Sequence, residues 1–99
     1  MIHVEIVKPT ASAMQPFIRL ADEINGADPN WIRQPRREMT RLLTGKDNEL
    51  FAQGIQRFFL AYDDDKPVAR VLAGVDLRRN AQTGRSEGYF SLFESYDNM

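Results

Sequence analysis

The stretch that decides the fold is Phe58–Val75, with the sequence FFLAYDDDKPVARVLAGV. Two apolar runs, Phe58–Tyr62 and Val68–Val75, flank the polar tetrad Asp63–Lys66. Runs rich in aromatic and β-branched residues are typical of strands, and a cluster of carboxylates cannot be buried cheaply. The stretch therefore predicts an antiparallel hairpin with an exposed acidic turn. Because both runs are almost continuously apolar, we expect the hairpin to lie mid-sheet, with both faces covered.

The N-terminal half of the chain predicts an edge strand and two helices. Apolar and polar residues alternate over Ile2–Ile6, which is typical of a half-exposed strand at a sheet edge. Apolar residues at spacings of three and four over Met14–Ile24 predict an amphipathic helix that ends near Gly26. A second helix is expected to begin with Pro35 in its first turn and to end at Gly45.

The C-terminal part predicts one further strand. The polar segment 76–84 indicates a long exposed turn, and Gly88–Glu94 has strand composition and should pair with Val68–Val75. The predicted order is β-α-α-β-β-β, an α+β fold in which two helices accompany an antiparallel sheet. The last strand has almost no charge before Glu94, and a long apolar edge associates with other chains unless it is covered. We therefore expect self-association, most simply as a homodimer.

The length, net charge and cysteine content exclude several classes of protein. Ninety-nine residues predict a single domain over residues 1–99, and a formal charge of −1 provides no general attraction to nucleic acid or membrane. The absence of cysteine excludes disulfides and thiolate metal sites, and a single histidine disfavours a histidine-based metal site. No apolar run is long enough to span a membrane and no signal peptide is evident, so a cytoplasmic location is expected.

Three groups of residues carry a resemblance to a known family. They are Asp28–Ile32 between the helices, Phe59–Tyr62 with Lys66–Val68 in the hairpin, and Tyr89–Glu94 opening into Tyr96–Asn98. With the element order, they make the chain similar to the opening half of the Gcn5-related N-acetyltransferase (GNAT) fold, in a group of bacterial GNAT-like proteins. The resemblance covers nearly all 99 residues and implies acyltransferase ancestry.

The resemblance also implies what the chain lacks. GNAT enzymes hold the pyrophosphate of acetyl-CoA on backbone N–H groups of a glycine-bearing loop that opens a later helix. That loop, with its Gln/Arg-x-x-Gly-x-Gly/Ala pattern, and the late tyrosine acid would lie after Met99. We therefore expect a GNAT-like domain that is not catalytic and binds no cofactor alone, with acetyl-CoA binding only if oligomerisation completes the site. The alternative is an acyl-CoA-dependent N-acetyltransferase whose site is completed by a second chain.

The candidate catalytic residue is Glu94, at the end of the last strand. A carboxylate there is able to act as general base on an amine, or it is simply a solvated group that closes the strand. The resemblance places Phe93, Ser95 and Tyr96 beside the pantetheine arm, as candidate substrate-binding residues. Asn30 and Trp31 are two further candidates, because tryptophan combines a large apolar face with a hydrogen-bond donor. Trp31 either lines an acceptor pocket or anchors its loop to the core.

Two clusters of charged residues suggest an interaction surface and a metal site, each on weaker evidence. A second alternative function is a protein or nucleic-acid interaction module that uses an arginine face, which is otherwise a solvated helix surface. The run Asp63–Asp65 suggests a metal, but consecutive residues on a tight turn cannot readily direct three carboxylates at one ion. We therefore expect no metal site. The arginine face comprises Arg33, Arg36, Arg37 and Arg41.

Overall fold

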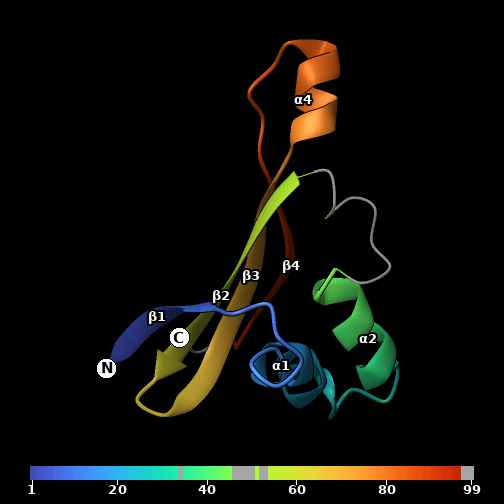
Figure 1. Cartoon of the computed structure of the whole chain (residues 1–99). Coiled ribbons are helices and arrows are strands. Elements are labelled where there is room, and N and C mark those ends of the chain that lie inside the picture. The colour runs from blue at the N-terminus through green and yellow to red at the C-terminus, as the bar shows by residue number, and fades with distance from the viewer. Residues whose placement is uncertain (34, 46–50, 52–53, 97–99) are drawn as a thin grey trace.

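A computed structural model describes residues 1–33, 35–45, 51 and 54–96 of the chain. In this part of the chain, a four-stranded antiparallel sheet with the order β1-β2-β3-β4 is accompanied by three helices (Figure 1). The predicted α+β class is confirmed. The elements are β1 (Ile2–Val7), α1 (Gln15–Asn25), α2 (Arg36–Leu43), β2 (Gly54–Asp63), β3 (Lys66–Asp76), α4 (Leu77–Thr83) and β4 (Tyr89–Ser95).

The hairpin β2–β3 occupies the centre of the sheet, as predicted. Asp63 pairs with Lys66, so the connection is a two-residue turn, and Asp64 takes a left-handed conformation with φ 54°. Aspartate tolerates this conformation better than most residues, which suits it to a tight hairpin turn. The carboxylates of Asp63 and Asp64 also accept hydrogen bonds from the Met1 ammonium, at 3.2 and 3.1 Å. The acidic turn therefore joins the start of β1 to the tip of the hairpin.

Helices α1 and α2 lie on one face of the sheet, which we call the inner face (Figure 1). The core between these helices and the sheet is apolar and closely packed. The rings of Phe17 and Phe58 meet edge to face there, with 5.3 Å between the ring centres. Pro16 lies in the first turn of α1, where its missing N–H costs no helical hydrogen bond. The buried core cluster contains Met14, Phe17, Ile18, Leu20, Leu43, Phe58, Leu60 and Leu72.

Among the described residues, nothing packs on the opposite face of the sheet, so this part of the chain does not supply the second of the two expected covers. The β1 residues Ile2, Val4 and Ile6 are 51%, 63% and 66% exposed, and they pair in register with outward-facing residues of β2. An apolar run shows that both faces of a strand are apolar, but it does not show that this chain supplies the second cover. We define the outer face as Ile2, Val4, Ile6, Ile55, Arg57, Phe59, Ala61, Asp63, Val71, Ala73, Val75 and Phe90.

The segment predicted as a long exposed turn contains the helix α4, which is a second correction. Asp76 caps its first turn by accepting a hydrogen bond from the Arg79 N–H at 3.0 Å. Gly84 follows its last turn with φ 70°, a conformation that glycine adopts without steric cost. The helix buries no residue and has no apolar stripe, so periodicity could not reveal it.

Because α4 gains little from packing, its cap should determine its stability. We expect Asp76→Ala to unfold α4 selectively, since losing an N-cap costs about 1 kcal/mol, which is large for a seven-residue helix. Amide hydrogen exchange over 77–83 should accelerate while exchange in β2 and β3 is unchanged. Asp76→Asn is the matched control, because asparagine caps helices as well as aspartate does. Equal exchange in Asp76→Ala and the wild type would contradict the prediction.

Strand β4 pairs with β3, as predicted, and forms one edge of the described sheet. The register shifts between Arg70 and Leu72, and Leu92 adopts a φ of 57°, so β4 contains a bulge. Asp97 and Asn98, which contributed to the family resemblance, lie outside the described residues. Among the described helices, none has the length and apolar character needed to cross a membrane.

Candidate functional site

A hollow of about 430 Å³ lies where β4 ends beside the C-terminal end of α1. Four of its residues, Phe93, Glu94, Ser95 and Tyr96, were predicted as site residues from the sequence, and the structure brings them together around one space. The hollow also contains Ile24 and Asn25 from α1. These two residues were not predicted, because about seventy positions separate them from β4 in the sequence.

Glu94 is half-buried and held by Asn25. The Asn25 side-chain amide donates to the Glu94 carboxylate at 3.2 Å and to the Ala21 carbonyl at 2.8 Å. The carboxylate is therefore oriented by a group that is itself fixed to the preceding turn of α1. An anchored carboxylate at the wall of a hollow is able to accept a proton from a polar ligand. Both roles that the sequence left open for Glu94, the general base and the solvated group that closes the strand, stay predictions.

A buried cation lies behind Glu94. Arg70 is only 2% exposed and pairs with Glu94 across β3 and β4. Its Nη1 donates to the Phe17 carbonyl at 2.7 Å, and its Nε donates to the Leu92 carbonyl at 3.0 Å. Burial lowers the pKa of the Arg70 guanidinium, and the negative charges of Glu94 and Asp22 oppose that lowering.

Arg70 thus ties α1 to β4 immediately below the hollow. Its guanidinium lies over the Phe17 ring, at 4.9 Å from the ring centre. Sequence analysis missed Arg70 because it stands within an apolar run. The available signal was a lone arginine in a strand otherwise fit for burial, since buried arginines are rare and need partners.

The other predicted residues at the strand end make local contacts. The Ser95 hydroxyl donates to the Tyr96 carbonyl at 3.0 Å, and the Tyr96 N–H donates to the Val68 carbonyl at 3.2 Å. The Lys66 ammonium lies 4.6 Å from the centre of the Tyr96 ring. Phe93 is largely exposed. The hollow therefore offers aromatic surface, one carboxylate and one amide to a ligand.

Asn30 and Trp31 lie outside this group of lining residues. The Trp31 indole N–H donates to the Asp22 carboxylate at 2.8 Å, and the side chain is half-buried. Asn30 is exposed, and its backbone N–H donates to the Asp28 carboxylate at 2.9 Å. This bond ties the loop to α1, and a role of Trp31 in substrate binding stays a prediction.

The charged clusters lie at the surface of the described part of the chain. All four arginines of the arginine face are exposed on α2 and the segment before it. The turn aspartates Asp63 and Asp64 form ion pairs with the Met1 ammonium. Among the described residues, no group of three or more histidine, cysteine or carboxylate side chains is arranged to bind a metal.

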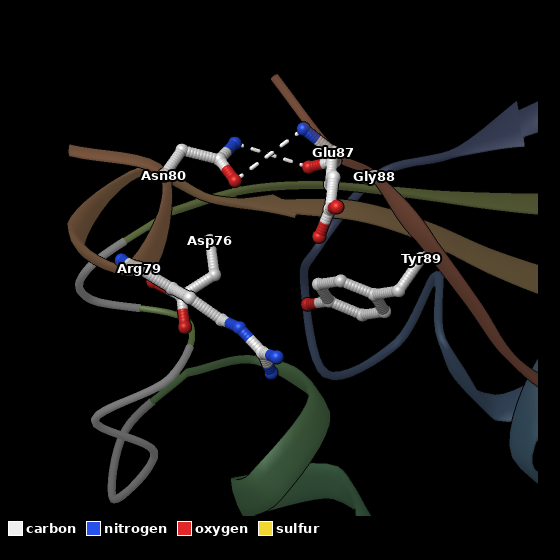
Figure 2. Close-up of a pocket in the computed structure, with 6 residues that line it drawn as sticks. All are labelled: Asp76, Arg79, Asn80, Glu87, Gly88 and Tyr89. Carbon is white, nitrogen blue, oxygen red and sulfur yellow. Dashed lines mark hydrogen bonds between the residues drawn. The ribbon is translucent and has the colours of Figure 1, made fainter. Parts of the chain in front are cut away.

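A second hollow, of about 320 Å³, lies between α4 and the start of β4. Figure 2 shows Arg79, Glu87 and the Tyr89 hydroxyl facing it, while the Asn80 amide bonds to the backbone of Glu87. The Tyr89 oxygen is buried and has no hydrogen-bond partner among the described residues. Burial, and secondarily the charge of Asp76, raise the pKa of Tyr89. The first hollow remains the better candidate, because its carboxylate is oriented by an anchored amide.

Comparisons with known proteins identify one relative of particular interest. The chain is 34% identical, over 89 residues, to a protein named bacterial ceramide synthase from Caulobacter vibrioides (strain NA1000 / CB15N). The match covers 89% of this chain and spans 23% of the length of that protein. No protein-family model matches the chain. No solved structure is significantly similar to it.

Proposed function

We propose that this chain is the acceptor-side portion of a GNAT-like N-acyltransferase, whose cofactor side is supplied by further polypeptide. The observation that carries the proposal is the placement of Glu94 at the wall of the strand-end hollow, held by Asn25. The relative from Caulobacter vibrioides adds chemical support, because a ceramide is a lipid amide and its synthesis forms an amide bond. GNAT enzymes, which the sequence resembles, form the same type of bond.

The proposed step is transfer of an acyl group to an amine. The amine lone pair attacks the acyl carbonyl carbon, the bond to the thiol leaving group breaks, and the amine loses one proton. In this role Glu94 accepts that proton, directly or through one water, and the released thiolate takes up a proton from solvent. Phe93 and the ring of Tyr96 supply apolar surface for the substrate beside the reacting amine.

A chimera tests this proposal. The 89-residue segment of the Caulobacter vibrioides protein is replaced by this chain, and ceramide formation is followed by mass spectrometry. We expect turnover above that of the protein lacking the segment. Glu94→Gln in the chimera should reduce turnover by about 100-fold, which is typical for removal of a general base. Glu87→Gln is the control, since Glu87 is exposed and pairs with Arg85 in the loop before β4.

Full turnover of the Glu94→Gln chimera would refute the role of Glu94. If the chimera does not fold, the site is probed in this chain alone, by NMR titration with a long-chain amine. Amide shifts confined to Asn25 and to Phe93–Tyr96 would support the acceptor site, and their absence at saturating amine would refute it.

Calorimetric titration of this chain with acetyl-CoA distinguishes the main alternative. The proposal predicts no binding, because the resemblance assigns the pyrophosphate loop to further polypeptide. Saturable binding would instead favour an N-acetyltransferase whose cofactor site is completed by a second copy of this chain.

A further inference from the structure

We infer that the outer face of the sheet is an interface between two copies of this chain, in which each copy inserts Phe90 into a hollow of the other. The inference is independent of the proposed acyl transfer, because it concerns the face opposite to α1, α2 and the strand-end hollow. Antiparallel sheets that face water on one side carry polar residues there. Here ten of the twelve outer-face residues are apolar, which indicates a face that is normally covered.

The outer face carries a hollow that suits an aromatic ring. Its volume is about 440 Å³, and Ala73 and Gly74 lie between larger lining residues. Phe90, which pairs with Ala73, lines the same hollow and is 81% exposed. Because the projecting ring and the hollow are adjacent, a two-fold axis passing beside Phe90 places each ring in the other copy's hollow. Such reciprocal contacts are the rule in symmetric dimers. The larger lining residues include Ile55, Arg57, Phe59 and Val75.

Arg57 favours an aromatic occupant. It is the single cationic residue of the outer face, and it makes no salt bridge with any described carboxylate. Its Nη1 donates only to the carbonyl of the adjacent Gln56, at 2.8 Å. The partner's Phe90 would enter beside this guanidinium and offer it the face of a ring, a favourable arrangement for a cation that lacks a counter-ion.

The size of the face agrees with a dimer. The exposed apolar side chains of the outer face present on the order of 700 Å², close to the roughly 800 Å² that each partner contributes to a standard interface. Two sheets that pack face to face bury such residues between them at a small angle. A membrane fits less well, because membrane surfaces attract clusters of basic residues, whereas this face has one arginine beside an acidic hairpin tip.

Sedimentation velocity across a range of protein concentrations tests the inference. The wild-type chain should pass from monomer to dimer as its concentration rises. Phe90→Ser should raise the dissociation constant at least tenfold, as expected for a central aromatic residue of an interface. Ile32→Ser is the matched control, because Ile32 is 85% exposed but lies outside the outer face, and its dissociation constant should equal that of the wild type.

A second variant keeps the test independent of how Phe90→Ser folds. Ala73→Leu fills the hollow from within its own chain and should weaken the dimer to a similar degree. A wild-type chain that remains monomeric at every concentration overturns the inference and leaves the face to a different partner. A dimer that survives both substitutions also overturns it, because the interface must then lie elsewhere, for example along the edge of β4.

Discussion

Replacing Arg70 with methionine should lower the free energy of unfolding by about 3 kcal/mol, the range measured when one member of a buried polar network is removed. The substitution keeps much of the side-chain volume but removes the donors to the Phe17 and Leu92 carbonyls. It also leaves the half-buried carboxylate of Glu94 without the nearby positive charge. The loss should be larger than the apolar gain, because the network would be broken on one side only.

Urea unfolding followed by circular dichroism measures this effect. Arg19→Met is the matched control, since Arg19 lies on the exposed side of α1 and its Nε donates to a carbonyl of its own helix, that of Gln15, at 3.3 Å. Its free energy of unfolding should change by less than about 0.5 kcal/mol, as is usual for surface substitutions. Equal effects of the two substitutions would show that the Arg70 network contributes nothing specific to stability.

Replacing Gly74 with alanine should also destabilise the fold, by about 1 kcal/mol, the lower end of the range for overpacking, because the Tyr89 ring borders two hollows into which it is able to shift. A methyl group at Gly74 would overlap the ring carbon that bears the Tyr89 hydroxyl and would lie 2.5 Å from the hydroxyl oxygen. The ring lies directly over the glycine, so it has to move before the substitution can be accommodated.

The same substitution in a Tyr89→Ser background identifies the cause. Without the ring, Gly74→Ala should cost nothing or stabilise slightly, because alanine reduces the conformational entropy of the unfolded chain. Thermal and urea unfolding of the four proteins give the coupling energy between the two positions. An equal cost in both backgrounds would place the strain in the backbone and contradict the proposed clash.

The central hairpin was predictable because its turn and its flanking strands agree. The carboxylates showed that the turn is exposed to solvent, and the apolar runs on both sides of it had the composition of strands. The same runs misled about the second layer, since Phe59 and Val71 are apolar whether or not this chain covers them. Helix α4 was missed because it has no buried side. Its two caps, Asp76 and Gly84, are visible in the sequence. Each marks only one turn of chain, so the pair does not predict a helix where the apolar residues show no helical periodicity.

Only those residues of the candidate site that are neighbours in the sequence were predictable. Glu94 and its neighbours were found because they end a strand, a position that the sequence can show. Asn25 and Arg70 were not, because their roles arise from contacts between α1, β3 and β4 that no local pattern encodes. For Trp31 the residue type alone left two roles open, and its bond to Asp22 could not be predicted because it joins the loop to α1.

The pairing of β1 with β2 has a consequence for how the chain folds. The hairpin β2–β3 closes through two residues, whereas pairing Val7 with Phe58 closes a loop of about fifty residues at a greater entropic cost. Strand β1 is therefore expected to join the sheet late and to detach early. Ile2, Val4 and Ile6 of β1 belong to the outer face. A second copy docked there would therefore contact β1 and keep it paired with β2, so that dimerisation and the last step of folding would stabilise each other.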